Sequence, residues 1–261
     1  MTKIIAVLLF LTTLCVKGQE SKYQLIWADE FNQSYLDTNY WTIEVNGHGG
    51  GNNELQYYTD RASNIRLENG LLVIEAHQEP FLEKQYTSAR IKTQKKAFWK
   101  YGRFEARMKL PYGQGMWPAF WMLGENISSV GWPKCGEIDI MEMIGGNAND
   151  STVYSTLHWA NIEDGGHKQH GDTLKLISGK LADDFHVYAV EWDEKTIKAF
   201  CDNACFFIID INSPEMHAFH NNFFIILNYA VGGNWPGSPI ETTVFPQKMQ
   251  VDYVRVYKKH D

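Results

Sequence analysis

The chain has 261 residues, of which 44% are hydrophobic and 21% are charged, and its formal net charge is −7. This composition excludes a disordered chain and a collagen-like repeat, which need far fewer apolar residues or a strict glycine period. The negative charge argues against a nucleic-acid partner, because a phosphate backbone is bound by surfaces rich in lysine and arginine.

The first residues are typical of a secretory signal peptide. Lys3 provides a positive charge, and the apolar run 4–14 is too short to cross a bilayer as a helix. Val16 and Gly18 then offer the small residues of a cleavage site before Gln19.

These features predict a signal peptide over residues 1–18 and a single catalytic domain over residues 19–261. The mature protein is expected to be secreted or periplasmic, with no membrane contact after cleavage. A lipid anchor on Cys15 is the disfavoured alternative, because Leu14 is bulkier than the small residue that usually precedes such a cysteine.

Period-two hydrophobicity dominates the rest of the chain. Residues 103–110 alternate polar and apolar side chains without a break, as in a strand with one buried face. Turn signals such as Asn69-Gly70 separate further expected strands, and no linker or repeat is evident. The pattern predicts one all-β antiparallel sandwich or barrel. The further strands are expected over Leu71–Ala76, Ser88–Thr93, Thr152–His158, Val187–Trp192, Phe206–Ile211, Phe223–Asn228 and Val251–Tyr257.

Two glycine-bearing or polar segments resemble ligand sites only superficially. Residues 47–51 are rich in glycine, but no Lys-Ser/Thr pair follows, so they are not expected to bind phosphate and are instead a candidate border of a cleft. His167 and His170 resemble zinc ligands, but their segment is polar and lacks cysteine, which favours a loop.

Tryptophans gather in the middle of the chain. Trp117 and Trp121 lie four residues apart in an apolar segment, Trp132 follows, and Trp235 lies on a loop between glycines. A single tryptophan is more often a core residue than a binding platform. A loop tryptophan is harder to explain as core, and aromatic planes stack on the apolar faces of sugar rings. This pattern favours a carbohydrate ligand.

Three carboxylates fall within residues 137–142. In a regular strand Glu137 and Asp139 would share one face, whereas Glu142 would point into the core. Because a lone ionised glutamate in a core is too costly, we predict a β-bulge at Ile140-Met141 that returns all three acids to one surface.

Crowded carboxylates cannot all ionise at neutral pH, so one of them is expected to hold a proton. A proton donor beside an ionised nucleophile is the pair that a retaining glycosidase uses, with the two groups about 5–5.5 Å apart. The alternatives are an exposed acidic strand face and an oxygen-rich calcium site. The neighbouring tryptophans favour catalysis.

Export would permit disulfides. Cys201 and Cys205 bracket a turn-like stretch, which is equally compatible with a local disulfide and with two thiols. Cys135 has no evident partner.

Residues 115–123 and 137–142 resemble the active-site segments of glycoside hydrolase family 16, and most closely its laminarinase (endo-β-1,3-glucanase) branch. The resemblance extends over nearly the whole mature chain. It implies a concanavalin-like β-jelly-roll sandwich with a concave substrate cleft and a retaining double displacement. By position Glu137 would be the nucleophile, Glu142 the general acid/base, and Asp139 the group that tunes them.

The resemblance also implies positions that contact the sugar. They are Asn52, with Glu54 as a further candidate, and Trp117, Trp121, Trp132 and His158 around the cleaved bond. Trp235 is the loop platform, and either Arg103 or Arg107 could face the cleft instead of solvent. No cofactor is expected for catalysis. A structural Ca²⁺ on the convex side would use Glu30, Gly70 and Asp252, partly through main-chain oxygens.

The expected function is a secreted, monomeric endo-β-1,3-glucanase that hydrolyses laminarin-type β-glucans with retention of configuration. A mixed-linkage β-1,3-1,4-glucanase and an enzyme that cleaves an algal galactan are alternatives. A non-catalytic β-glucan-binding protein is the alternative from another class, which the three acids disfavour. Met141 and the tryptophan segment favour the laminarinase branch.

Overall fold

The computed structural model describes residues 22–146 and 149–260. The predicted signal peptide and the candidate anchor Cys15 lie outside the described residues. Within them, no helix is both long and apolar enough to cross a membrane.

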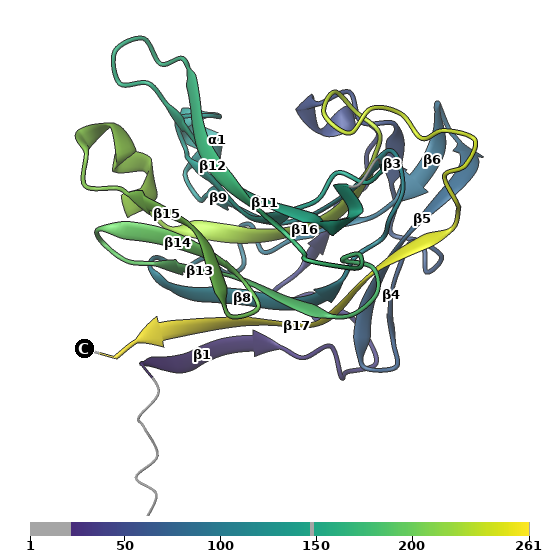
Figure 1. Cartoon of the computed structure of the whole chain (residues 1–261), viewed down its shortest axis with the longest axis horizontal. Helices are drawn as coiled ribbons and strands as arrows, with labels where there is room; N and C mark the ends of the chain where they lie inside the picture. Colours follow the sequence, from purple (N-terminus) through teal and green to yellow (C-terminus); the bar gives the residue numbers. More distant parts are fainter. Residues whose placement is uncertain (1–21, 147–148, 261) are drawn as a thin grey trace, which may run out of the picture.

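Two β-sheets lie face to face and form a sandwich (Figure 1). The ten strands of the larger sheet are β1 (Tyr23–Asp29), β3 (Gln56–Tyr58), β4 (Ile65–Glu68), β5 (Leu71–Phe81), β6 (Lys84–Ser88), β8 (Gly102–Lys109), β13 (His186–Trp192), β14 (Thr196–Cys201), β15 (Ala204–Asp210) and β17 (Gln247–Lys259). The seven strands of the smaller sheet are β2 (Thr42–Ile43), β7 (Arg90–Lys92), β9 (Met116–Gly124), β10 (Glu137–Glu142), β11 (Thr152–Ala160), β12 (His167–Lys175) and β16 (Phe223–Val231).

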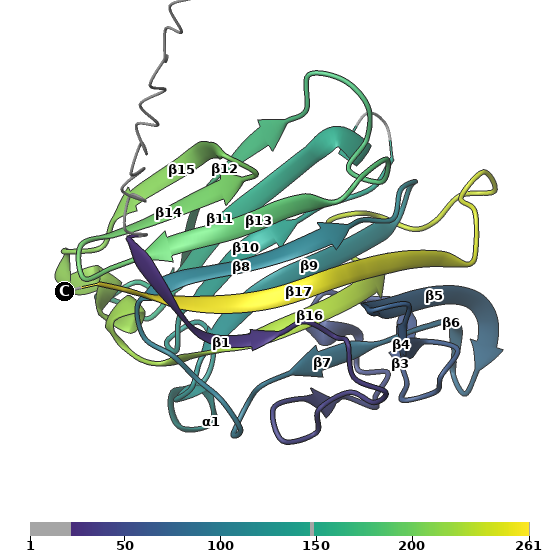
Figure 2. The ribbon, with the colours of Figure 1, turned by 90° about the horizontal axis from the view of Figure 1, so that it is seen from below.

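The larger sheet runs β15-β14-β13-β8-β17-β5-β6-β3, and β1 and β4 pair with β17 and β5. Figure 2 shows this outer sheet, with β1 beside β17. The smaller sheet runs β12-β11-β10-β9-β16-β7-β2. Every pairing is antiparallel except that of β3 with β6, so the predicted antiparallel all-β sandwich is confirmed. The short helices are η1 (Gly49–Gly51), α1 (Ile127–Val130), η2 (Asn149–Ser151) and η3 (Pro214–His220).

The core lies between the two sheets. On β8 the alternation predicted from sequence holds: Phe104, Ala106 and Met108 are fully buried, and Arg103, Glu105 and Arg107 lie on the other face. Strand β16 is buried on both faces, because its odd-numbered residues join the main core and Phe224 and Ile226 join a smaller cluster. The smaller sheet therefore has apolar support beneath its central strands.

The prediction of a loop at His167 and His170 is wrong. These residues belong to β12, which pairs with β11 along its whole length. Strand β12 is the edge of its sheet and is exposed on both faces, so its sequence carries no alternation of polar and apolar residues. The tip of the β11–β12 hairpin rises at the upper left of Figure 1.

The strand expected over Ser88–Thr93 is divided between the layers. Strand β6 ends at Ser88 in the larger sheet, and β7 begins at Arg90 in the smaller one. The chain crosses between the layers at the buried Ala89.

The three cysteines of the described chain are free thiols, so the disulfide alternative for Cys201 and Cys205 is not realised. In the β14–β15 hairpin Cys201 lies opposite Ala204, and Cys205 lies opposite Phe200. The two cysteines are therefore not a directly facing pair. Burial raises the pKa of Cys201 to about 12, which keeps its thiol protonated.

Candidate active site

The acidic strand β10 contains the predicted β-bulge. Its register shifts between Asp139 and Met141 against β9, and between Asp139 and Glu142 against β11. Ile140 is the extra residue relative to β9, and its side chain is fully buried. The bulge restores Glu142 to the side of Glu137 and Asp139. The β-bulge predicted at Ile140-Met141 is therefore confirmed.

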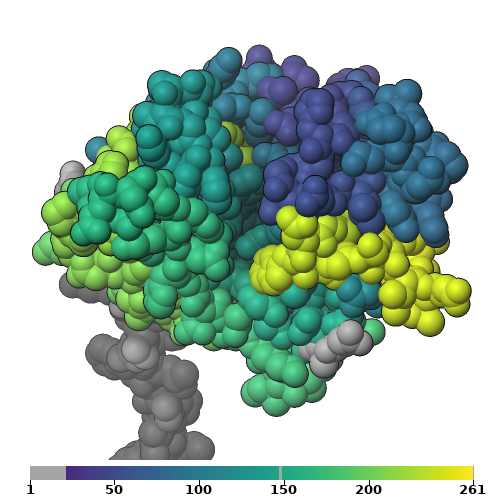
Figure 3. Space-filling view, turned by 90° about the horizontal axis from the view of Figure 1, so that it is seen from above, coloured from purple at the N-terminus to yellow at the C-terminus, as the bar shows by residue number. Residues whose placement is uncertain are grey.

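The three acids lie in a cavity of about 600 Å³ on the outer face of the smaller sheet. Figure 3 looks into this hollow, which separates the teal and green part of the face from the purple and yellow part. Nine of the residues predicted as catalytic or substrate-binding line the cavity: Asn52, Trp117, Trp121, Trp132, Glu137, Asp139, Glu142, His158 and Trp235.

Two tryptophans hold the two glutamates. Trp132 Nε1 donates to Glu137 Oε2 at 2.8 Å, and Trp117 Nε1 donates to Glu142 Oε1 at 2.9 Å. Trp132 is 48% exposed, whereas Trp117 is buried in the cleft floor. Each indole therefore fixes one carboxyl oxygen and leaves the other available to a ligand.

Asp139 and His158 form the centre of the site. His158 Nε2 lies 2.9 Å from Asp139 Oδ2 and 3.9 Å from Glu137 Oε1. The strand pairing explains this geometry, because His158 lies directly opposite Glu137 on β11. The ligand atoms of these three residues lie within 4.8 Å of one another, a spacing that could also hold a metal ion.

Burial raises the pKa of all three acids. It is the largest cause in each case, and it raises the pKa of Glu137 and of Asp139 to about 8. The pKa of Glu142 rises well above its usual range, because burial is reinforced by repulsion from both other acids. For Glu137, repulsion by Asp139 is opposed by His158 and Trp132. Glu142 is therefore the acid expected to keep its proton, and Glu137 the one expected to ionise.

The raised pKa of Asp139 gives a prediction for stability. The folded protein retains a proton on Asp139 between the unfolded pKa of about 3.9 and the folded value of about 8, so its free energy of unfolding falls as pH rises through this window. Asp139→Asn removes this titration. The difference in stability between the variant and the parent should therefore shift in favour of the variant from pH 4 to pH 8, by up to about 5 kcal/mol or roughly 10 °C in Tm.

Thermal unfolding of both proteins at the two pH values checks this expectation. The quantity to compare is the Tm of Asp139→Asn minus the Tm of the parent. A difference that is more negative at pH 8 than at pH 4 would contradict the expectation. That result would mean that the ion pair with His158 outweighs the burial of the carboxylate.

The cleft walls carry the remaining predicted sugar contacts. Trp121 Nε1 donates to Asn228 Oδ1 at 2.6 Å, which fixes its ring on the cleft floor. Trp235 is 40% exposed and meets the rings of Trp117 and Tyr154 edge-on. Asn52 accepts a main-chain hydrogen bond from the loop that carries Trp235. This loop and the glycine segment are therefore joined on one side of the cleft.

Glu54 lies beneath that wall. It is buried and accepts hydrogen bonds from Gln56 and from the hydroxyl of Tyr58. Gly50 covers it at φ +57, and a Cβ there would meet the Glu54 carboxylate at 2.0 Å. The positive φ and this close approach both favour glycine at position 50, which accounts for one residue of the glycine run predicted to border a cleft.

Arg90 and His167 also line the cleft and were not predicted as site residues. The guanidinium of Arg90 lies over the ring of Trp121, at 4.9 Å from its centroid. His167 on β12 stacks on His158, with Nε2 2.8 Å from His158 Nδ1, and its ring centroid lies 4.6 Å from that of Trp132. Arg90 and Lys92 flank the buried Ile91, and this alternation could have placed Arg90 on the polar face of a strand. His167 lies in an edge strand whose residues are nearly all exposed, so no alternation of polar and apolar residues marks it.

Neither candidate arginine on β8 faces the cleft. This strand belongs to the larger sheet, where Arg103 binds Glu105 at 2.8 Å and Arg107 binds Asp252 at 2.8 Å. The expectation that one of them faces the substrate is wrong, because the alternation of a single strand does not identify the sheet to which it belongs.

By strand register, the candidate calcium residues lie along one side of β17. Strand β1 pairs with the second half of β17, and β5 pairs with the first half, so Glu30 and Gly70 approach Asp252 from the two ends of a gap. Both carboxylates are engaged: Arg255 donates to both oxygens of Glu30, and Arg107 to Oδ2 of Asp252. A cation here would depend on main-chain oxygens and on the other oxygen of Asp252.

Comparison with known proteins identifies the family. The sequence model of "Glycosyl hydrolases family 16" matches residues 50–255, which include the bulged strand and the cleft. The chain belongs to glycosyl hydrolase family 16. This membership and the glucanase relatives make the chain a hydrolase and the acid cluster its candidate hydrolytic site.

Individual relatives agree with the family. The chain is 42% identical over 248 residues to a "Beta-glucanase" of Rhodothermus marinus, which covers 90% of this chain and 85% of that protein. It is 44% identical to the structure of the laminarinase catalytic domain of Thermotoga maritima, with a TM-score of 0.84 over 92% of this chain and 100% of the other. It is also 44% identical to part of the clotting factor G alpha subunit of Tachypleus tridentatus, with 92% of this chain matching 35% of that protein.

Proposed function

We propose that this glycoside hydrolase is an endo-β-1,3-glucanase that hydrolyses laminarin-type β-glucans with retention of configuration. The observation that carries the proposal is the bulged strand, which brings Glu137, Asp139 and Glu142 together on the floor of a tryptophan-lined hollow. The similarity to the β-glucanase and the laminarinase domain supports this substrate class.

In the proposed reaction Glu137 attacks the anomeric carbon while Glu142 protonates the leaving oxygen. Glu142 then takes a proton from water, which attacks the anomeric carbon from the face that the leaving group has left, opposite Glu137, and releases Glu137. The indoles that bind the two glutamates keep these carboxyl groups oriented through both steps. His158 and Asp139 adjust the charge beside the nucleophile.

Hydrolysis of a panel of laminarin, lichenan, agarose and carrageenan tests the substrate. We expect the highest kcat/KM on laminarin and shorter laminari-oligosaccharides as early products. Preferential hydrolysis of lichenan would instead favour the mixed-linkage alternative. Hydrolysis of agarose without hydrolysis of laminarin would overturn the proposal, and binding of laminarin without hydrolysis would favour the non-catalytic alternative.

Trp235 is proposed to stack on a glucose ring. Because it is 40% exposed and contacts its neighbours only at their edges, Trp235→Ala is expected to weaken laminari-oligosaccharide binding about tenfold. Its effect on the free energy of unfolding should stay below about 1 kcal/mol. Titration calorimetry and thermal unfolding measure the two effects. A large loss of stability with unchanged binding would instead make Trp235 a structural residue.

We further propose export after cleavage of residues 1–18. The charge of Lys3 and the short apolar run support it. Expression of the full chain in a secreting host, followed by N-terminal sequencing, tests this: the mature protein is expected to begin at Gln19. A cell-retained protein that still begins at Met1 would contradict it.

A structural Ca²⁺ held by Asp252 and the main-chain oxygens of Glu30 and Gly70 is proposed as well. The strand register, which places Glu30 and Gly70 on the side of β17 that carries the pairings with β1 and β5, supports it. Chelation should lower Tm, added Ca²⁺ should restore it, and Asp252→Ala should remove the response. A Tm that does not depend on Ca²⁺ in the parent would contradict the site.

A further inference from the structure

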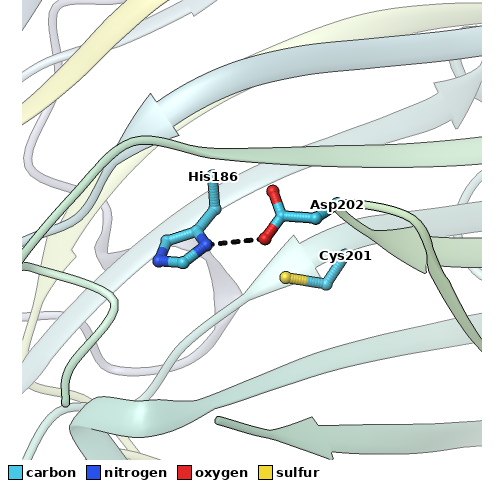
Figure 4. Close-up of side chains that lie close together, drawn as sticks. All are labelled: His186, Cys201 and Asp202. Atoms are coloured by element: carbon cyan, nitrogen blue, oxygen red, sulfur yellow. Dashed lines mark hydrogen bonds and ion pairs between the residues drawn. The ribbon is translucent and has the colours of Figure 1, made fainter. Parts of the chain in front are cut away.

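A second cluster of metal-binding side chains lies in the larger sheet, which is not the sheet that carries the acids. His186 begins β13, Cys201 ends β14, and Asp202 starts the turn that follows. Figure 4 shows the imidazole, the thiol and the carboxylate turned toward one another. Their ligand atoms all lie within 4.8 Å.

The turn fixes two of these side chains. Asp202 has φ +54 and donates its main-chain N–H to the carbonyl of Val187. Its Oδ1 accepts the N–H of Val187 at 2.9 Å, and its Oδ2 lies 2.9 Å from Nδ1 of His186. The carboxylate is therefore held beside the imidazole by the start of β13.

A buried hydroxyl beside the cluster has no partner. Tyr188 lies directly opposite Cys201 in the β13–β14 ladder and is fully buried. Its hydroxyl makes no hydrogen bond within the described residues, and an unpartnered buried hydroxyl is costly. The ring centroid of Tyr188 also lies 6.3 Å from that of His186, so the residue borders the cluster on the side of both ligands. A bound ion with its water would supply the missing partner.

The cluster is also accessible. A cavity of about 640 Å³ borders it and is lined by all three side chains together with Asp183 and Asp184. Lys175 and Lys180 also line it, and with Asp183, Asp184 and Asp202 they leave the lining a formal charge of −1, which does not repel a cation. An ion could therefore reach the site without opening the sandwich.

We propose that His186, Cys201 and Asp202 bind one zinc-like divalent cation. A set of imidazole nitrogen, thiolate sulfur and carboxylate oxygen is typical of Zn²⁺, whereas Ca²⁺ and Mg²⁺ select oxygen ligands. Binding releases the thiol proton of Cys201 to solvent and replaces the His186–Asp202 hydrogen bond with two metal bonds. Three protein ligands leave a fourth position for water. The ion would join the ends of β13 and β14 and serve stability, away from the cleft.

Cobalt(II) is the probe, because it binds zinc sites and gives an absorption band when a thiolate is a ligand. The metal-free protein is titrated with Co²⁺. We expect a thiolate-to-cobalt charge-transfer band that saturates at one equivalent and disappears when Zn²⁺ is added. The band also separates this site from the trio of Glu137, Asp139 and His158, which contains no sulfur.

Three variants locate the site. Cys201→Ser should lose the band, and Cys205→Ser is the matched control that should keep it, since Cys205 is exposed on the same hairpin and lies outside the cluster. Asp202→Asn can keep the turn, because asparagine accepts the same main-chain hydrogen bond and tolerates positive φ. It should weaken Co²⁺ binding by at least about tenfold, as even the loss of an outer-shell partner costs about 10–100-fold.

Thermal unfolding gives an independent measure. Zn²⁺ should raise the Tm of the parent and of Cys205→Ser, and should not raise that of Asp202→Asn to the same extent at the same concentration. Hydrolytic activity should be unchanged by Cys201→Ser. Absence of the band in the parent, or a band that survives Cys201→Ser and is lost in Cys205→Ser, would overturn the proposal. Zn²⁺ binding without a thiolate band would overturn it as well.

Discussion

Glu137→Ser is expected to lower kcat on laminarin by about four to six orders of magnitude, because the variant has no group that can form the glycosyl-enzyme bond. Binding of a laminari-oligosaccharide should stay within a few-fold of the parent value. Trp132, which donates to Glu137, is already 48% exposed, so it can lose this partner without leaving a buried donor unpaired.

The two effects are measured by reducing-sugar release and by calorimetric titration on the same preparation. Glu163→Ser is the matched control, since it makes the same substitution at an exposed turn residue outside the cavity. A variant that retains more than about a tenth of the parent kcat would show that Glu137 is not the nucleophile. Loss of binding together with activity would mean that the substitution damages the cleft.

Glu142→Gln should have the second largest effect, and it depends on the leaving group. With laminarin, which needs protonation of the leaving oxygen, we expect kcat to fall by about 10²–10⁴-fold. With an aryl β-glucoside that has an acidic phenol as leaving group, formation of the intermediate needs no acid. Its hydrolysis then stalls, because no base activates water. Azide, which needs no base, should release the intermediate as a β-glycosyl azide.

The pH profile gives a second readout of Glu142. In the parent, activity requires Glu137 to be ionised and Glu142 to be protonated, so kcat/KM should rise and then fall as pH increases. The fall comes from loss of the Glu142 proton, whose pKa burial and the neighbouring acids hold well above its usual range. Glutamine cannot lose that proton, so the alkaline fall should disappear for the aryl substrate. If it persists and azide has no effect, Glu142 is not the acid/base.

The bulge in β10 could be predicted because it follows from local parity. Glu137 and Glu142 are five residues apart, which places them on opposite faces of a regular strand, and an ionised Glu142 in the core would be too costly. One extra residue resolves the conflict, and the buried Ile140 takes that position. Short-range side-chain alternation and the cost of burying charge were sufficient to locate it.

Other parts of the site depend on pairing between distant strands and could not be predicted in this way. Trp117 and Trp132 were predicted as sugar contacts, but no local pattern indicates that their N–H groups donate to the glutamates. The neighbour of His158 was missed because the edge strand β12 has no buried face, so His167 lies in a polar stretch without periodicity.

The same reason explains the error at Arg103 and Arg107. Their alternation correctly identified a strand with one polar face, but that face could belong to either layer of the sandwich. Only the pairing of β8 with β13 and β17 assigns it to the larger sheet, whose outer face is away from the acids.

The most direct test of the proposed mechanism is the configuration of the first product sugar, followed by proton NMR during early hydrolysis of a laminari-oligosaccharide. If Glu137 forms a covalent intermediate that Glu142 resolves with water, the β anomer should appear first, and the α anomer should grow in only by mutarotation. An α anomer that appears first would mean a single inverting displacement, and the roles of both glutamates would have to be reassigned.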